Sequence, residues 1–224
     1  MLSEVAVIVP VHDEEALLPG CLESLRAAGA RRVIAVLDAC TDRSPAIARA
    51  YGVRVVELAA RNVGAARHAG AVEALRAGAA WLASTDADSL VPPDWLVRQL
   101  AYARDGADVV AGTVRVSDWT GWPPGLAARY AERYARRHDH VHGANLGLSA
   151  RAYRRTGGFP ALRLAEDRAI VHRALRAGLR VRWATDLPVR TSARPTSRTL
   201  GGFATHLRDL APGGPLSAAS CQVR

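Results

Sequence analysis

Two aspartates that stand two positions apart, Asp86 and Asp88, are the residues best suited to chemistry in this sequence. They close an apolar run that begins near residue 81, and in an extended strand alternate side chains point the same way, so both carboxylates can face one ligand. Carboxylate oxygens are ligands that Mg²⁺ and Mn²⁺ accept, and such ions take further oxygens from water and phosphates. The pattern predicts a divalent metal site beside a phosphorylated ligand; the alternative is a solvated loop.

Polar and acidic residues follow two further apolar runs. The run 5–11 (VAVIVPV) leads into His12, Asp13 and Glu14, and the run 32–38 ends at Asp38. Such β-branched runs are typical of strands that are buried on both faces. Because ligands of open parallel sheets bind outside the carboxyl ends of the strands, the three polar strand ends predict one shared site.

The segments between these runs have helical spacing. Leu18, Cys21, Leu22 and Leu25 form one apolar stripe, and Gly29 ends that helix. Further helices are expected from Ser44 (as N-cap, with proline in the first turn), after Asn62 up to about residue 77, and after 92–94, alternating with strands at 53–58, 81–88 and 108–116. The alternation predicts an α/β fold, an open and mostly parallel sheet with helices on both faces.

The pattern changes after residue 116. The stretch 119–137 interleaves Trp and Tyr with Arg, and Tyr130 and Tyr134 would share a helix face. This face either packs on the sheet or forms a wall for an acceptor, and its basic character also permits loose attachment to an anionic membrane. Beyond it we expect a short strand at 142–146, helices at 150–156 and from Glu166 (apolar face Ile170, Val171, Ala174 and Leu175), and a strand at 180–184. A single domain over 1–211 and a disordered tail at 212–224 fit this organisation.

Composition excludes several classes of protein. All 30 basic residues are arginine, so a P-loop, a pyridoxal enzyme, a protein kinase and a serine β-lactamase, which all need a lysine, are excluded. The first strand-to-helix turn, PVHDEE, lacks G-x-G-x-x-G, and no G-x-S-x-G occurs, which argues against hydride transfer and an α/β-hydrolase. Three scattered cysteines indicate neither a zinc site nor a disulfide framework.

Charge and hydropathy point to the partners. The net charge of +9 reflects either arginine-rich codon usage or a partner that carries phosphates. No nucleic-acid-binding motif is present, so we expect no nucleic acid partner. No apolar run reaches the ~20 residues of a membrane helix, and the start of the chain does not resemble a signal peptide, so a cytoplasmic protein, peripheral at the inner membrane face at most, is expected.

Six motifs in order resemble the family-2 glycosyltransferases of the GT-A fold: VPVHDEE, LDACTDRS, RNVGAARHAG, TDAD, GANLGLSARAYRRTGGF and AED. The resemblance covers roughly residues 5–185. It implies a Rossmann-like nucleotide-sugar-binding half at about 1–116 and a smaller, mixed acceptor half at about 117–211. It also implies an inverting transfer of a sugar from a UDP- or GDP-linked donor to a hydroxyl of a carbohydrate, lipid or small molecule, dependent on Mg²⁺ or Mn²⁺.

The resemblance also assigns roles at the donor. Asp88 would ligate the metal, and Asp86 would lie near the ribose or in the water shell of the metal. The residues that it places at the nucleotide are Pro10, Val11, His12, Glu14, Asp38, Arg67 and Asp86. The candidates for a third metal ligand are His142, His172 and His206, or none of them.

Glu166 and Asp167 match the E-D motif of the family, which implies that Asp167 is the general base and that Glu166 orients the acceptor or supports Asp167. In an in-line displacement the acceptor must lose a proton, and a carboxylate within hydrogen-bond reach can take it. The alternative is that both residues only favour a helix start. Gly143, Ala144 and Asn145 would form the floor under the sugar.

Two other readings stay open from the sequence. A nucleotidyltransferase also uses carboxylate-held Mg²⁺, but it needs a glycine-rich first turn with basic residues, whereas PVHDEE is acidic. A non-catalytic module that binds nucleotide sugars is the third reading, and the presence of both acidic motifs argues against it.

Overall fold

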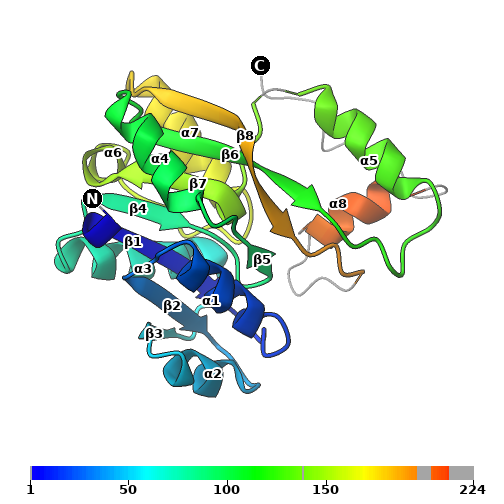
Figure 1. Cartoon of the computed structure of the whole chain (residues 1–224), viewed down its shortest axis with the longest axis horizontal. Helices are drawn as coiled ribbons and strands as arrows, with labels where there is room; N and C mark the ends of the chain where they lie inside the picture. Colours follow the sequence, from blue (N-terminus) through cyan, green and yellow to red (C-terminus); the bar gives the residue numbers. More distant parts are fainter. Residues whose placement is uncertain (1, 138, 196–202, 212–224) are drawn as a thin grey trace. The chain divides into compact units, whose positions relative to one another are not determined.

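The structure is a computed structural model in which residues 2–137, 139–195 and 203–211 are described (Figure 1). The chain forms two compact units. Unit 1 comprises Met1–Arg115 and Asp139–Thr191, and unit 2 comprises Val116–His138 and Ser192–Arg224. The sequence pattern changes where unit 2 starts, but the acceptor half expected at about 117–211 does not correspond to unit 2, because Asp139–Thr191 belongs to unit 1. The tail that was predicted to be disordered, 212–224, lies outside the described residues.

The described strands form one sheet in the order β3-β2-β1-β4-β7-β6-β8-β5. The strands β1 (Val5–Val11), β2 (Val33–Asp38), β3 (Arg54–Leu58) and β4 (Trp81–Ser84) are parallel neighbours. β7 (Leu146–Ser149) runs antiparallel between β4 and β6 (Val109–Val116), and β5 (Ser89–Leu90) pairs antiparallel with β8 (Val181–Thr191). The predicted open, mostly parallel α/β sheet is confirmed.

Helices cover both faces of this sheet. α1 (Leu18–Ala27), α2 (Ser44–Ala50) and α4 (Trp95–Arg104) share one buried cluster with the odd-numbered residues of β1. On the other face, α3 (Val63–Arg76), α6 (Ala150–Arg155) and α7 (Glu166–Arg176) pack with Ala6 and Ile8 of the same strand. Both sides of β1 are therefore buried, which explains why its sequence is apolar throughout instead of alternating.

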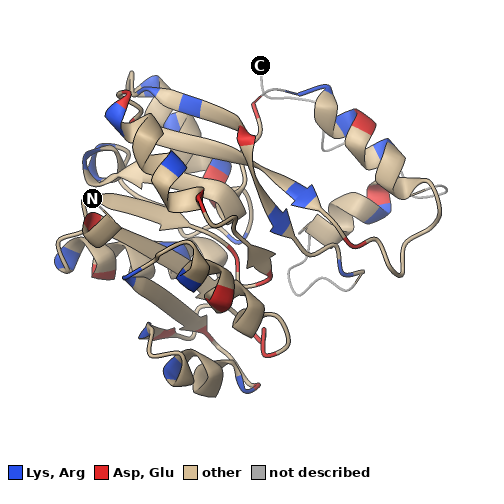
Figure 2. Ribbon diagram, viewed as in Figure 1, with Lys and Arg blue, Asp and Glu red and all other residues tan. Residues whose placement is uncertain are grey.

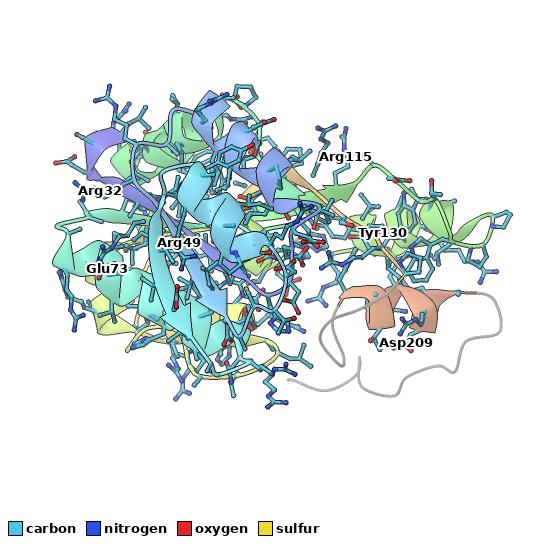
Figure 3. All side chains as sticks on the ribbon, turned by 90° about the horizontal axis from the view of Figure 1, so that it is seen from below. Arg32, Arg49, Glu73, Arg115, Tyr130 and Asp209 are labelled. Carbon is cyan, nitrogen blue, oxygen red and sulfur yellow. The ribbon has the colours of Figure 1, made fainter. Side chains whose placement is uncertain are left out.

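Unit 2 has a small core of its own. α5 (Leu126–Ala135) and α8 (Phe203–Leu210) contribute Leu126, Tyr130 and Leu207 to it. The ring centroids of Tyr130 and Tyr134 lie 5.3 Å apart, which confirms that they share a helix face, and Phe203 packs edge-on at 5.8 Å from Tyr130. Tyr130 is thus buried within unit 2. Tyr130 is labelled in Figure 3.

Four local expectations are wrong, each for a physical reason. Ser44 is the first residue of α2 and not its N-cap, because its hydroxyl accepts from the N–H of Glu14 (2.8 Å). Residues 143–145 form a 3-10 turn, and the strand begins only at Leu146. Leu175 is 47% exposed, since α7 turns only its narrower stripe to the sheet. The last strand continues to Thr191, beyond the expected end at 184.

Two short 3-10 turns complete the described elements, η1 (Leu2–Glu4) and η2 (Gly143–Asn145). Within the described part of the chain, no helix combines the length and the hydropathy needed to cross a bilayer.

Candidate active site

Strained backbone gathers at one edge of the sheet. Among the described residues, every non-glycine residue with a left-handed φ lies in a loop after β1, β2 or β3, or directly before α7: Asp13 (53°), Ala39 (54°), Arg61 (47°) and Ala165 (60°). For an L-residue this conformation costs about 1–2 kcal/mol, and such strain concentrates where a fold positions functional groups. The acidic residues of the loops after β1 and β2 can be followed in Figure 2.

Arg67 joins the two acidic motifs. Its side chain is 4% exposed and forms ion pairs with Asp86 through Nη2 and with Glu166 through Nη1. Nε donates to Oγ of Ser84, at the end of β4, over 3.1 Å. Arg67 lies on α3, Asp86 follows β4 and Glu166 begins α7, so one buried guanidinium holds three elements of unit 1 at the same point.

The carboxylates at this point outnumber the guanidinium group. Burial raises the pKa of Glu166, with Asp167 and Asp86 acting in the same direction and Arg67 opposing them. The pKa of Asp86 is raised by burial and by the charges of Asp167 and Glu14, again against Arg67. Because the carboxylates outnumber the single arginine, Glu166 and Asp86 each favour either a proton or an added cation.

Asp167 is held by the backbone on both of its oxygens. The N–H of Gly143, in η2, donates to Oδ2 over 2.7 Å, and the N–H of Arg168 donates to Oδ1 over 2.7 Å. The side chain is half-buried. A carboxylate oriented by two amides beside the Arg67 cluster has the fixed geometry that a proton acceptor needs, since each oxygen keeps a further lone pair.

Asp86 and Asp88 lie in a turn, and not in a strand as the sequence suggested. β4 ends at Ser84, and the turn closes through Ser89, whose N–H donates to the carbonyl of Asp86 (3.1 Å) and whose hydroxyl donates to Asp88 (3.3 Å). The alternation argument therefore does not apply, although the two residues remain at the carboxyl edge of the parallel strands.

The charge at this turn fits a divalent cation. The thiol of buried Cys21 donates to the carbonyl of Asp86 (3.4 Å), and burial followed by the charges of Asp88, Asp86 and Glu14 raises its pKa. Three carboxylates thus lie within electrostatic reach of one sulfur atom. The Asp86 side chain is 35% exposed, so hard oxygen ligands are present with access from solvent.

Asp38 organises the loop that leads into α3. It is 4% exposed, and its carboxylate accepts from the N–H groups of Ala60 (2.7 Å), Arg61 (2.8 Å) and Asn62 (2.7 Å). Asn62 in turn caps α3 by accepting from Ala65. These bonds set the start of the helix that carries Arg67. The contact of Asp38 with a nucleotide base stays a prediction.

The remaining residues assigned to the nucleotide surround the end of β1. Val11 and Glu14 are buried, and Pro10 and His12 are half-buried. Nδ1 of His12 lies 2.6 Å from the carbonyl oxygen of Asp38, so the ends of β1 and β2 are linked. The structure brings these residues to one edge, as the sequence predicted, and their contact with a nucleotide stays a prediction.

Asn145 ties the core together. It is fully buried, its Oδ1 accepts from the indole of Trp95 (2.9 Å), and its Nδ2 donates to the carbonyls of Thr113 (2.8 Å) and Leu187 (2.7 Å). This arrangement leaves the Asn145 side chain no surface for the predicted sugar contact. Gly143 and Ala144 are also buried, and Gly143 places its backbone beside Asp167 and Arg67.

The histidines proposed as further metal ligands are dispersed. His142 precedes Gly143 and stacks on His140 with ring centroids 5.9 Å apart. His172 is exposed on α7, and His206 is on α8 in unit 2. Of the three, His142 is adjacent in sequence to Gly143, whose N–H donates to Asp167.

A separate polar group links the loops after β1 and β2. Asp13, Cys40 and Asp42 place their ligand atoms within 4.8 Å of one another. Asp13 Oδ1 accepts from the N–H of Thr41 (2.6 Å), and Asp42 accepts from the N–H groups of Glu15 (2.8 Å) and Ser44 (2.9 Å). Asp42 therefore stabilises the loop that leads into α2.

Sequence reasoning missed three contributors: Ser84, Cys21 as a neighbour of the acidic turn, and Gly64. A Cβ at Gly64 would overlap the backbone of Pro160 and Leu162, so the glycine allows α3 to meet the segment before α7. The available signal for Ser84 was Arg67 among the small residues VGAARHAG, because an arginine packed closely against a sheet needs polar partners.

Comparison with known proteins places this chain in a family. The model of glycosyl transferase family 2 matches residues 6–157. A dolichyl-phosphate hexose transferase of Haloferax volcanii is 30% identical over 157 residues, which cover 68% of this chain and 67% of that protein. An undecaprenyl-phosphate 4-deoxy-4-formamido-L-arabinose transferase of Pseudomonas aeruginosa is 33% identical over 167 residues, 68% of this chain and 47% of that protein. The chain thus spans about two thirds of one relative and about half of the other.

The fold is that of GT-A glycosyltransferases. The mannosyltransferase of Pyrobaculum calidifontis, solved in complex with GDP-Man and Mn²⁺, matches with a TM-score of 0.64 and 24% identity over 85% of this chain and 57% of that one. The curled, mostly parallel sheet, the acidic turn after β4 and the matched family model lead to one conclusion: the chain belongs to glycosyl transferase family 2.

Proposed function

We propose that this chain carries the catalytic part of an inverting glycosyltransferase that moves a sugar from a UDP- or GDP-linked donor to a polyprenyl phosphate. The observation that carries the proposal is the link through Arg67 between Asp86, on the donor side, and Glu166, on the acceptor side. Family membership supports the reaction class. The acceptor class is supported by the names of the two relatives, a dolichyl-phosphate hexose transferase and an undecaprenyl-phosphate 4-deoxy-4-formamido-L-arabinose transferase.

The donor would lie at the carboxyl edge of β1, β2 and β4. Pro10, Val11, His12 and Glu14 gather at the end of β1, and His12 links it to Asp38. Arg67 acts here as a positioning residue, because its buried guanidinium is engaged by Asp86, Glu166 and Ser84. The resemblance to the family implied that Arg67 contacts the nucleotide directly, and we replace that role with positioning.

Asp88 and Asp86 would hold Mg²⁺ or Mn²⁺. When bound, the cation supplies positive charge to the departing diphosphate. The excess of carboxylates over arginine in this cluster supports the assignment, as does the Mn²⁺ bound in the structurally similar mannosyltransferase. Arg67, Glu166 and Asp167 are positioned by contacts within the protein itself.

Asp167 would act as the general base. A polyprenyl phosphate is a monoester whose second pKa is about 6, so part of it carries one proton near neutral pH, and a crowded acidic site favours that form. The acceptor oxygen forms its bond to the anomeric carbon while the bond from that carbon to the diphosphate breaks. The proton passes to Asp167, and the nucleoside diphosphate leaves with the electron pair. Single displacement inverts the anomeric carbon. For a hydroxyl acceptor the same step removes the hydroxyl proton.

Incubation of the purified chain with a panel of UDP- and GDP-sugars, Mn²⁺ and a short polyprenyl phosphate in detergent tests the proposal. The expected result is a glycosylated lipid phosphate in at least one donor combination, and its anomeric configuration follows from NMR. A control reaction with an unphosphorylated polyprenol separates phosphate from hydroxyl acceptors.

Two outcomes would contradict the proposal. One is synthesis of a nucleotide sugar from a nucleoside triphosphate and a sugar phosphate, which is the nucleotidyltransferase reaction. The other is donor binding without transfer or hydrolysis for every donor and acceptor, which is the behaviour of a binding module.

A further inference from the structure

A short apolar loop lies directly before the candidate base. Residues 161–165, here called the leucine loop, expose Leu162 (44%) and Leu164 (43%) to solvent. Asp167 lies two positions after the last residue of this loop. Large apolar side chains displayed together on a soluble surface mark contact with a partner more often than isolated ones do.

The backbone of the leucine loop is fixed although its side chains are exposed. The carbonyl of Leu162 accepts from the N–H of Gly64 (3.0 Å), and the carbonyl of Ala161 accepts from Nδ2 of Asn62 (3.1 Å). Gly64 has no room for a Cβ against this loop. The two leucines are therefore presented by a rigid segment, and are not exposed because the chain is loose.

The charges beside the leucines are basic. Arg163 lies between them, Arg168 follows on α7, and Arg61 precedes the Asn62 that holds the loop; all three are exposed. None of the three guanidinium groups forms an ion pair with a described residue. The acidic neighbours face elsewhere: Glu166 is buried on Arg67, and Asp167 accepts from Gly143.

We infer that the leucine loop, with Arg61, Arg163 and Arg168, docks this chain on the surface of an anionic lipid bilayer. Leucines flanked by arginines match a bilayer in both chemistries, because the apolar side chains enter the acyl boundary while guanidinium groups bind lipid phosphates. The inference rests on the proposed function, in which the acceptor phosphate lies at such a surface. It brings that surface to the position of Asp167.

Binding to vesicles without donor or acceptor tests the inference separately from the enzymatic reaction. The full chain is sedimented with vesicles of phosphatidylcholine and phosphatidylglycerol, and with vesicles of phosphatidylcholine alone. We expect binding to the anionic vesicles that is stronger by about tenfold and weakens with salt.

The decisive variant replaces both exposed leucines, Leu162→Ser with Leu164→Ser. Its matched control is Val97→Ser with Leu175→Ser, which removes apolar groups that are 51% and 47% exposed on α4 and α7. We expect the leucine pair to lose at least about tenfold in binding to anionic vesicles and the control pair to change less than about twofold. Leu164→Phe should bind more strongly, which provides a gain that a folding defect cannot imitate.

A second variant, Arg163→Gln with Arg168→Gln, tests the contribution of charge. It should weaken binding to the anionic vesicles and leave binding to neutral vesicles unchanged. The inference is overturned if the leucine pair binds as the wild type does, if the control pair loses as much, or if the wild type ignores anionic vesicles. Transfer to polyprenyl phosphate in detergent does not depend on docking, so the proposed function can hold where this inference fails, and the reverse.

Discussion

The N–H of Gly143 donates a 2.7 Å hydrogen bond to Oδ2 of Asp167, and the two residues belong to different elements, η2 and the first turn of α7. Gly143 also lies against Arg67, since a Cβ at this position would overlap the guanidinium group. One glycine therefore contacts both the candidate base and the arginine that joins the acidic motifs. Gly143, the first glycine of the GANLGLS motif, is required for the close approach of Arg67 to the backbone and not for a turn.

Asp167→Asn tests the role of this carboxylate as base. The amide cannot take a proton, so transfer should fall by about 10²–10⁴. Since both carboxylate oxygens accept backbone N–H groups, the amide NH₂ must face one donor, and the free energy of unfolding should drop by about 1 kcal/mol. Donor affinity, measured by calorimetry with Mn²⁺, should stay at the wild-type value. Asp105→Asn, an exposed position, is the control. Transfer at the wild-type rate would leave Asp167 as a helix start only.

Asp88→Asn tests the metal assignment. The substitution removes one hard ligand in a turn, so metal-dependent binding of UDP or GDP should be lost while the fold is kept. Calorimetric titration of the nucleotide in the presence and absence of Mn²⁺ gives the comparison, with Asp105→Asn again as the control. The assignment of Asp88 is rejected if the Mn²⁺-dependent gain in affinity persists in the variant.

Gly64→Ala should destabilise the protein although alanine favours helices. At this position a Cβ would overlap the backbone of Pro160 and Leu162, whereas at Gly20, in α1, the nearest atom is a flexible Leu90 methyl group at 3.4 Å. We expect Gly64→Ala to cost about 1–3 kcal/mol and Gly20→Ala to gain about 0.5–1 kcal/mol. Urea unfolding of both variants measures whether the free energy of unfolding changes in opposite directions. A gain in stability at both positions would mean that the segment before α7 shifts at little cost to accommodate the added Cβ.

The parallel half of the sheet could be predicted because each part is specified locally. The run 5–11 is apolar throughout because a hydrophobic cluster covers each of its two faces, and the stripe of Leu18, Cys21, Leu22 and Leu25 is buried as its spacing indicates. The length of β4 could not be predicted, because a polar residue after a strand looks the same in the sequence whether the chain continues or turns. Here the bond from Ser89 to the carbonyl of Asp86 decides for a turn.

The site could be predicted in its members but not in its contacts. Arg67 and Glu166 are 99 positions apart, and no periodicity links them. Asn145 was predicted to lie under the sugar, yet burial beside Trp95 gives it a packing role that only the three-dimensional contacts reveal. Asp38 likewise holds three backbone amides that its own strand does not contain.

Tyr153 should make the stability sensitive to pH in an alkaline window. Burial raises its pKa from 10.0 to about 12, against the lowering effect of the hydrogen bond from the N–H of Phe159. The raised pKa stabilises the fold fully below pH 10, where both states hold the proton, and this contribution is lost as the pH rises from 10 to 12. The loss can reach about 2–3 kcal/mol. Burial also raises the pKa values of Tyr130 and Cys21, so the Tyr153 contribution is separated from theirs by comparison with a variant.

Tyr153→Phe provides the comparison. It loses the hydroxyl that contacts His68 (3.0 Å), so it should be less stable near neutral pH. Its stability should then fall less steeply than that of the wild type between pH 10 and 12. Parallel pH profiles of the two proteins would mean that the Tyr153 hydroxyl ionises like that of an exposed tyrosine.

The pair of Arg67 and Glu166 should be strongly coupled, because both side chains are 4% exposed. Arg67→Met leaves Glu166 buried without its cation and should cost about 3–5 kcal/mol in the free energy of unfolding. Glu166→Gln leaves the guanidinium with Asp86 and should cost less. In the double variant the uncompensated charge is absent, so its cost should be smaller than the sum of the single costs by at least about 1 kcal/mol. A second cycle with Arg54→Met and Glu73→Gln, an ion pair whose arginine is 66% exposed, should show coupling below about 1 kcal/mol. Additive costs at Arg67 and Glu166 would show that the guanidinium is held by Asp86 and Ser84 alone, and that it does not join the two acidic motifs.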